Sequence, residues 1–138
     1  MVYKKDVGFV SLKSVDGVID TLVLSIKTKP FLPNMHTIQR SQGFVTKIDK
    51  KKPWGIDGGL PRKEIYDVFL TINGKQVPMS KESYNDLFEP GNNFDIHYDK
   101  MGDIYIHMLN SDGAGYYDLI WVINNGKLIK RYTDNSNA

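Results

Sequence analysis

Short runs of alternating apolar and polar residues, separated by Gly and Asn, are the feature that most constrains the fold of this chain. Alternation with a period of two is typical of half-buried strands, and Asn-Gly supplies the positive φ angles of a tight hairpin turn. The pattern predicts hairpins that join residues 7–13 to 18–27, 64–73 to 75–79 and 116–123 to 127–132. The side chains expected on their buried faces include Val18, Leu22, Leu24, Ile26, Val68, Leu70 and Ile72.

The density of these runs predicts a mainly β domain of roughly eight strands, an antiparallel β-sandwich or a partly open barrel. Residues 119–123 are apolar on both faces, which favours a central strand with both faces covered. One short helix is expected at residues 80–88, where Ser80 can cap the first amides. With this helix the fold would be α+β in class. The 138-residue chain can bury one core, so we predict a single domain over residues 1–138 with a frayed tail at 133–138.

Residues 93–109 permit a prediction of strand register. Only an even register, with a three-residue turn at 100–102, keeps both apolar sets on one face. Asp95 then lies opposite His107, and His97 shares their polar face. The three side chains could converge on a divalent metal, but a simple cross-strand pair of Asp95 with His107 on an exposed face is the simpler interpretation.

The break into Asn-Ser-Asp-Gly-Ala-Gly at residues 110–115 separates two apolar runs. Asn110, Asp112, Tyr116 and Tyr117 form a weak candidate for ligand binding. The twelfth position of the break is Trp where a calcium loop needs Glu, and no Lys follows the glycines closely enough for a phosphate loop. We favour a wide connection or bulge in which Asn110 and Asp112 bond to local backbone.

Residues 50–65 form a long loop that begins with three consecutive lysines and contains one Trp and several Gly and Pro residues. Long loops in compact domains are often functional, and a Trp beside basic residues has the composition of a recognition hot spot. The alternative is that the Trp folds inward and closes the end of the sandwich. The candidate partner-binding residues are Lys51, Lys52, Trp54, Asp57 and Arg62.

The charges are unevenly distributed along the chain. Residues 40–64 contain seven basic and three acidic residues, whereas residues 81–118 contain two basic and eight acidic residues. Such asymmetry suits an oriented encounter with a charged partner, although a solvated mixed surface is the simpler interpretation. A net charge of +2 with a single basic-aromatic run argues against nucleic-acid binding.

The absence of cysteine excludes disulfides, thiol catalysis and thiolate zinc sites. No apolar stretch is long enough for a membrane span, and the first residues lack the apolar core of a signal peptide. We therefore expect a cytoplasmic protein without a cofactor; an exported form whose signal has been removed is the alternative. The sequence leaves monomer and homodimer open.

Four motifs carry a resemblance to a group of small, uncharacterised bacterial proteins. They are the Trp-Gly-x-Asp-Gly-Gly-x-Pro loop at 54–61, Ile-Asn-Gly at 72–74, Tyr-x-Asp-Leu at 84–87, and Ser-Asp-Gly-Ala-Gly at 111–115 before Trp121. The resemblance implies a bacterial source and two loops that belong to the fold. In size, lack of cysteine and uneven charge the chain is also similar in type to immunity proteins of bacterial toxin systems.

Two classes of function follow from these features. The first is a non-catalytic binding protein, such as an inhibitor or immunity protein, that docks a protein partner through the Trp54 loop or the acidic hairpin. The second is a small-molecule or metal-binding domain, or an enzyme, that uses Asp95, His97, His107 and Asp112. No nucleophile or oxyanion donor is identifiable beside these groups, which favours the first class.

Overall fold

The computed structural model describes residues 5–15, 19–91, 93–110 and 115–135, with side chains from residue 21 onwards. In this part of the chain ten strands form three antiparallel sheets, so the fold is mainly β as predicted, with more strands than the eight expected. The first sheet has the order β1 (Lys5–Val15), β2 (Ile19–Pro30), β5 (Lys63–Ile72), β6 (Lys75–Val77). The second has the order β10 (Lys127–Asp134), β9 (Tyr117–Asn124), β8 (Ile104–Asn110), β7 (Asn93–Tyr98). The third contains β3 (Ile38–Ser41) and β4 (Phe44–Ile48).

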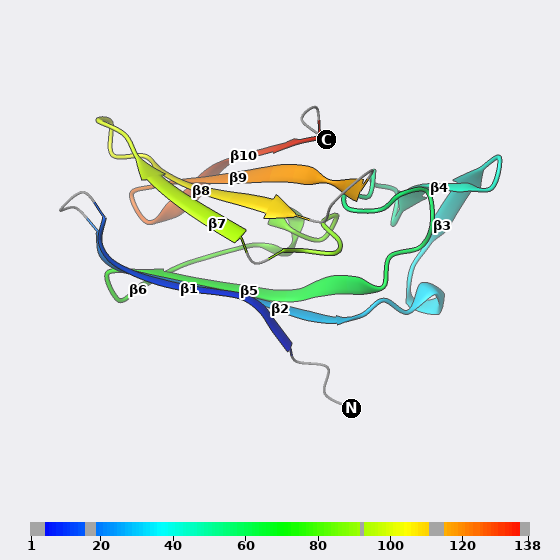
Figure 1. Ribbon diagram of the computed structural model, residues 1–138, viewed down its shortest axis with the longest axis horizontal. Helices are drawn as coiled ribbons and strands as arrows, with labels where there is room; N and C mark the ends of the chain where they lie inside the picture. The colour runs from blue at the N-terminus through cyan, green and yellow to red at the C-terminus, as the bar shows by residue number, and fades with distance from the viewer. Residues whose placement is uncertain (1–4, 16–18, 92, 111–114, 136–138) are drawn as a thin grey trace.

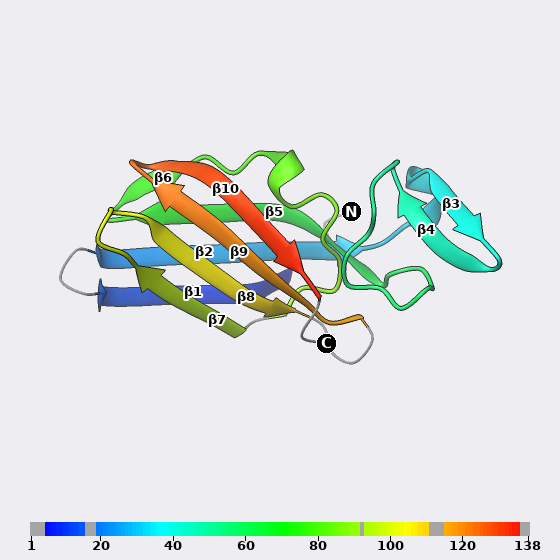
Figure 2. The ribbon, with the colours of Figure 1, turned by 90° about the horizontal axis from the view of Figure 1, so that it is seen from above.

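The two four-stranded sheets lie face to face as a sandwich, and their strands cross obliquely (Figures 1 and 2). The β3–β4 hairpin lies outside the sandwich, at the end where β2 finishes and β5 begins (Figure 2). A 3₁₀ turn, η1 (Pro33–Met35), leads from β2 into this hairpin. The third sheet is thus an appendage at one end of the molecule.

The predicted hairpins are confirmed. β1 pairs with β2, β5 with β6, and β9 with β10, and the Asn-Gly turns at 73–74 and 125–126 have the positive φ angles that such turns require. The predicted register of the β7–β8 hairpin is also correct, since Asp95 lies opposite His107 and Gly102 has φ 86°. Local alternation and turn chemistry were sufficient to set these pairings.

The main core lies between the two large sheets. The side chains of Leu22, Leu24 and Ile26 are fully buried, and Val68 and Leu70 lie beside them on the neighbouring strand β5. The second sheet contributes Ile106, Met108, Leu119, Trp121 and Ile123. Val18 lies outside the described residues, and Ile72 is half-buried at the margin. Burial of this apolar surface is the main stabilising contribution to the fold.

The strand at residues 119–123 is flanked by β8 and β10, as its composition predicts. Its outer face is covered at Val122 and half-exposed at Ile120. The frayed tail predicted for 133–138 is wrong for Thr133 and Asp134, because both belong to β10. Residues 136–138 lie outside the described part of the chain.

The helix predicted at residues 80–88 is wrong. The chain makes only one 3₁₀ turn there, η2 (Lys81–Ser83), and the Ser80 side chain does not cap it. Beyond η2 the segment is extended enough for its backbone to pair with Trp54, whose amide donates to the Asp86 carbonyl. Tertiary contacts on both sides of the segment outweigh its weak helical propensity.

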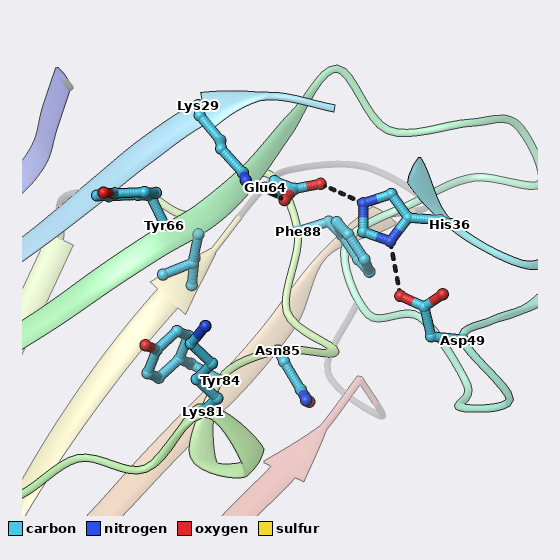
Figure 3. Close-up of a pocket in the computed structure, with 10 residues that line it drawn as sticks. Lys29, His36, Asp49, Glu64, Tyr66, Lys81, Tyr84, Asn85 and Phe88 are labelled. Carbon is cyan, nitrogen blue, oxygen red and sulfur yellow. Dashed lines mark hydrogen bonds and ion pairs between the residues drawn. The ribbon is translucent and has the colours of Figure 1, made fainter. Parts of the chain in front are cut away.

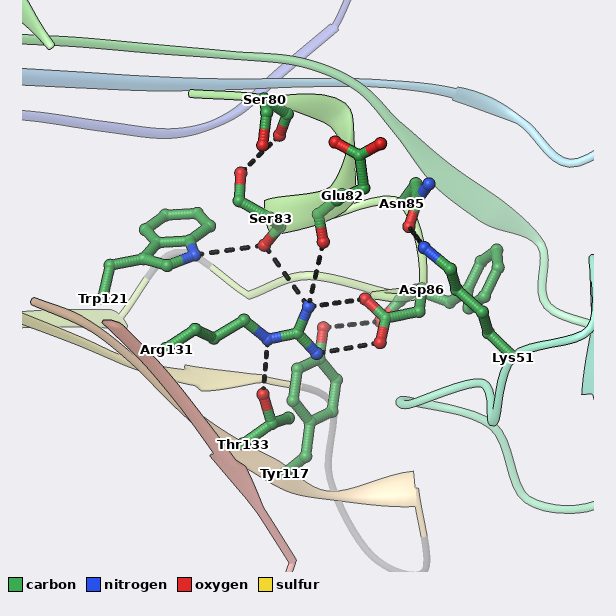
Figure 4. Close-up of polar contacts among 11 residues, drawn as sticks. Lys51, Ser80, Glu82, Ser83, Asn85, Asp86, Tyr117, Trp121, Arg131 and Thr133 are labelled. Atoms are coloured by element: carbon green, nitrogen blue, oxygen red, sulfur yellow. Dashed lines mark hydrogen bonds and ion pairs between the residues drawn. The ribbon is translucent and has the colours of Figure 1, made fainter. Parts of the chain in front are cut away.

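The segment of residues 80–89, which we call the connecting segment, lies along the β6–β10 edge of the sandwich (Figures 2 and 4). Its carbonyl groups accept hydrogen bonds from buried side chains: Trp121 Nε1 donates to Ser83 O at 3.1 Å, and Tyr117 Oη donates to Phe88 O at 2.9 Å. Tyr84 and Leu87 join the main core. The connecting segment therefore closes one side of the sandwich.

Candidate functional site

The Trp54 side chain lies on the inner side of its loop, against the sandwich. It is half-buried, packs against the main core and lies 6.3 Å from the Tyr117 ring between centroids. Lys52 places its Nζ 4.1 Å from the centre of the indole ring and so covers part of it, in a cation–π contact. The structure therefore agrees with the alternative in which Trp54 closes the end of the sandwich.

The other predicted partner-binding residues differ in accessibility. Lys51 donates from Nζ to Asn85 Oδ1 at 2.8 Å and is half-buried, so it fastens the loop to the connecting segment. Asp57 is exposed, and the Arg62 side chain is 91% exposed, with its Nε 3.8 Å from Glu89. Of the predicted set, Lys52, Asp57 and Arg62 remain available at the surface.

Gly55 shows why the chain after Trp54 must approach the connecting segment without a side chain. Its φ is +98°, and a Cβ at this position would lie 2.2 Å from the Phe88 carbonyl oxygen and 2.9 Å from the Tyr117 ring. Both distances are shorter than van der Waals contact permits. The glycine is required by the close approach of two backbones.

The outer face of the second sheet brings together several of the other predicted residues. His107 Nε2 lies 3.0 Å from Asp118 Oδ1, and the Tyr116 hydroxyl donates to the same oxygen at 2.7 Å. That hydrogen bond, followed by burial and the Asp118 charge, raises the pKa of Tyr116. An open groove of about 440 Å³ runs beside this cluster and is lined by His107, Asp118, Ile120, Tyr132, Thr133 and Asp134.

The proposed metal cluster is not assembled. Asp95 and His97 are exposed on β7, while His107 on β8 turns to Asp118 on the other neighbouring strand. Among the residues that the structure describes, no group of three or more His, Asp or Glu side chains is arranged to hold a metal ion. The competing pair of Asp95 with His107 is also replaced by His107 with Asp118, because β9 offers a carboxylate on the same face.

The residues predicted as a weak ligand site at 110–117, as far as the structure describes them, are divided between the core and the outer face of the second sheet. Asn110 is fully buried and accepts a hydrogen bond from the Gly91 amide at 2.7 Å, a distant rather than a local partner. Tyr117 is fully buried in the main core, and burial raises the pKa of its hydroxyl. Asp112 lies outside the described residues, and Tyr116 belongs to the outer-face cluster.

A cluster that the sequence did not reveal lies where the β3–β4 hairpin joins the sandwich (Figure 3). His36 Nδ1 is 2.6 Å from Asp49 Oδ2, and His36 Nε2 is 2.7 Å from Glu64 Oε2. The imidazole stacks on the Phe31 ring at 4.5 Å between centroids. Lys29 Nζ lies 3.5 Å from the other Glu64 oxygen. A histidine is thus held between two carboxylates from different parts of the fold.

Protonation of the His36 ring is favoured by this arrangement. Burial is the largest single influence and lowers the pKa of His36, but the hydrogen bonds to Asp49 and Glu64 and the charges of both carboxylates outweigh it, so the pKa is raised above 6.5. For Asp49, burial raises the pKa, yet the bonds from His36 and the Thr37 amide bring it below 3.8. The two shifts together describe an ion pair.

An open pocket of about 180 Å³ lies beside this cluster. Its polar lining includes Lys29, Glu64, Tyr66, Lys81, Tyr84 and Asn85, which come from two strands and the connecting segment (Figure 3). Its cationic and anionic groups are mixed, so it has no single ligand preference that the lining would dictate. The pocket gives solvent access to the histidine cluster.

The hairpin end of the molecule, which we define as residues 32–62 and which includes η1, β3, β4 and the loop of residues 50–62, carries exposed apolar side chains. Met35 is 72% exposed and Phe44 62% exposed. Leu32, just before η1, and Leu60 are also exposed. Beneath them a small second core of Phe31, Val45, Ile48 and Phe88 attaches the hairpin to the sandwich. Nearly half of the exposed large apolar side chains in the described part of the chain belong to this end.

No family model, curated protein or solved structure matches this chain. The helical turns in the described residues are too short and too polar to cross a membrane. The resemblance to small bacterial proteins therefore stays a prediction.

Proposed function

We propose that this protein is a non-catalytic binding protein that docks an acidic protein partner through its hairpin end. The observation that carries the proposal is the exposure of Met35 and Phe44 on elements that lie outside the sandwich. Large apolar side chains cost free energy when they face water, and when surrounded by polar residues they are typical of protein–protein contact sites. Phe44 on the appended hairpin and Met35 on the turn before it are both open to a partner.

The charge of the hairpin end supports an acidic partner. Its exposed basic side chains are Arg40, Lys47, Lys50, Lys52 and Arg62. Of the two acidic side chains here, Asp49 is paired with His36, which leaves Asp57 as the other. A positive rim around an apolar centre attracts an acidic surface during the encounter and disfavours a basic one.

An inhibitor or immunity protein is the class of binding protein that we favour. The similarity in type, in size, lack of cysteine and uneven charge, supports this class. Such a protein works by covering part of its partner, which needs a stable scaffold and a contact surface. The sandwich provides the scaffold, and the hairpin end provides the contact surface.

The test is capture of partners from a lysate of the source organism on the immobilised protein, followed by titration of the purified partner. We expect Met35→Ala and Phe44→Ala to weaken binding by at least about tenfold each, as central apolar contacts do. Binding should also weaken at high salt, because the basic rim is screened. Met101→Ala is the matched control, since Met101 is 82% exposed on the β7–β8 turn.

Two outcomes would end the proposal. One is a partner whose affinity falls with Met101→Ala, and the other is a partner whose affinity is unchanged by both Met35→Ala and Phe44→Ala. Trp54→Ala is a poor probe of binding in this design, because Trp54 packs against the main core. Each variant should therefore first be checked for native stability. Phe44 and Met35 lie outside both apolar cores of the described residues, so their truncation should leave the fold intact.

A second candidate function is supported by the groove on the outer face of the second sheet. The groove is concave and combines carboxylates, an imidazole and an aromatic ring, which suits a small polar ligand with hydrogen-bond donors. Titration of amine and sugar probes, followed by the NMR signals of His107, tests this candidate. His97 is the internal control because it is exposed on β7, away from the groove. Equal shifts of both histidines would argue against a specific site.

A further inference from the structure

We propose that His36 is a protonation latch, which holds the β3–β4 hairpin against the sandwich while its ring carries two N–H groups and releases the hairpin when the ring carries one. The latch itself is a property of the fold. Its effect on partner binding rests on the proposed function, because the hairpin carries Phe44. The latch would make docking sensitive to pH.

The geometry requires a doubly protonated ring. Each imidazole nitrogen of His36 lies within hydrogen-bond distance of a carboxylate oxygen, at 2.6 Å to Asp49 and 2.7 Å to Glu64. An ionised carboxylate can only accept, so each nitrogen must donate. A neutral ring has one donor, and its other nitrogen would direct a lone pair at a carboxylate. Loss of one proton therefore turns one of the two attractions into repulsion.

The placement of the three residues decides which contact holds the hairpin. His36 precedes β3 and Asp49 follows β4, so both belong to the base of the hairpin, whereas Glu64 lies on β5 in the sandwich. The base is also closed by two backbone-linked bonds: Thr37 N donates to Asp49 Oδ1 at 2.9 Å, and Asp49 N donates to Thr37 O at 2.8 Å. These bonds persist when the ring is neutral.

The contact of His36 with Glu64 is consequently the ionic link between the hairpin base and the first sheet. When the contact with His36 is lost, Glu64 keeps its ion pair with Lys29, whose Nζ lies 3.5 Å from Glu64 Oε1. The hairpin forms no strand pairing with either large sheet in the described part of the chain. Its other contacts with the rest of the fold include the small apolar core, the stacking of His36 on Phe31, and the Val45 amide, which donates to Gly58 O at 2.9 Å.

The groups around His36 leave it as the side chain that changes charge near neutral pH. Titratable or charged groups face the cluster from every element packed against it: Asp49 after β4, Glu64 and Tyr66 on β5, Lys29 on β2, and Lys81 and Tyr84 on the connecting segment. Carboxyl groups ordinarily titrate below about pH 5, and lysine and tyrosine above about pH 9.5. Histidine alone ordinarily titrates between these limits.

The direction of the switch follows from the raised pKa of His36. The protonated, latched form is complete below the ordinary histidine range and is lost as pH rises through the raised value. Release therefore occurs at a pH above the ordinary histidine value of 6.5. On the acid side, the contact of His36 with Asp49 is lost only below pH 3.8, where Asp49 becomes protonated, because the pKa of Asp49 is lowered.

The absence of cysteine makes a direct test possible. Two cysteines introduced by Lys47→Cys on β4 and Gln76→Cys on β6, both exposed positions, can carry spin labels without competing thiols. Pulsed electron–electron double resonance then gives the distribution of distances between the label on the hairpin and the label on the sandwich. We expect one narrow distribution at about pH 6 and a broader or displaced one at about pH 9, with the midpoint at the His36 titration followed by NMR.

The same labels in a His36→Gln background provide the control. Glutamine cannot change charge in this range, so its distribution should be the same at both pH values, whether the hairpin is held or free. An unchanged distribution in the native background, or an equal pH response in the variant, would overturn the latch. Should the variant fail to fold, a midpoint that differs from the NMR titration of His36 would overturn it equally.

Binding of the captured partner separates the latch from the proposed function. If affinity changes between the two pH values in the native protein and stays constant in His36→Gln, the latch regulates docking. If the partner shifts the pKa of His36 by one unit, linkage requires the affinity for the partner to change by about tenfold between the two pH values. A hairpin that opens with pH while affinity stays constant would overturn the regulatory role and leave the latch itself intact.

Discussion

Arg131 and Asp86 form a two-armed ion pair in which Nη1 lies 2.7 Å from Oδ1 and Nη2 lies 2.9 Å from Oδ2 (Figure 4). The pair joins β10 to the connecting segment. Arg131 Nε also donates to Thr133 Oγ1 at 2.7 Å, which fixes the plane of the guanidinium group. Both side chains are mostly shielded from solvent, so this pair belongs to the stronger class of charged contacts.

Arg131→Ala should therefore destabilise the protein. Removal of one partner leaves the Asp86 carboxylate shielded and unpaired, and we expect a loss of about 2–4 kcal/mol in the free energy of unfolding. Urea unfolding followed by tryptophan fluorescence measures the change. Arg62→Ala is the matched control, since its contact to Glu89 is solvent-exposed and should cost less than about 1 kcal/mol. Equal losses would contradict the assignment.

Substitution of Gly55 tests the close approach of the Trp54 loop to the connecting segment. Gly55→Ala must displace the Phe88 carbonyl as well as hold alanine at positive φ, so we expect a loss above about 3 kcal/mol. Gly43→Ala meets the same kind of φ, +84°, with no atom within 4 Å, and should cost only about 1–2 kcal/mol. The difference between the two melting temperatures isolates the steric contribution.

Trp54 and Phe44 should show opposite responses to truncation. Trp54→Ala removes part of the core and should lower the free energy of unfolding by about 2–3 kcal/mol, while the fraction that remains folded binds the partner normally. Phe44→Ala should leave stability within about 0.5 kcal/mol because the ring is exposed, and it should weaken binding. Calorimetric unfolding and titration on the same samples make the comparison. Loss of binding by folded Trp54→Ala protein would instead assign the central contact to Trp54 itself.

The stability of the native protein should fall as pH rises from 6.5 through the raised pKa of His36. The folded state binds the His36 proton more tightly than the unfolded state, so stability is fully present at lower pH and declines once the unfolded chain has lost that proton. Urea unfolding at several pH values measures the slope. His36→Gln should lack this decline, and a parallel decline in both proteins would assign it to another group.

The sequence predicted strand pairing well because each hairpin is specified locally. Ile72-Asn73-Gly74 and Asn124-Asn125-Gly126 combine alternating strands with residues suited to positive φ, and these features require no knowledge of distant contacts. The even register of β7 and β8 followed from keeping Phe94 and Ile106 on the same face. The class of fold was predictable for the same reason.

The site was predicted less well because its contacts are distant in sequence. His36 meets carboxylates 13 and 28 residues away, and neither spacing forms a recognisable motif. His107 was singled out correctly for the outer face, but its partner Asp118 belongs to the next strand and was missed. The connecting segment was misassigned because local propensity favoured a helix while Arg131, Trp121 and Trp54 hold it in another conformation.

The β3–β4 hairpin makes its strand hydrogen bonds within itself in the part of the chain that the structure describes. Its tip, Gln42-Gly43, is exposed, and Gly43 has no atom within 4 Å of where a Cβ would lie. Such a tip tolerates insertion, because added residues neither break a ladder nor enter a core. The tip of the hairpin can therefore change in length and composition while the sandwich keeps its structure. Grafting a peptide epitope between residues 42 and 43 would use this freedom directly.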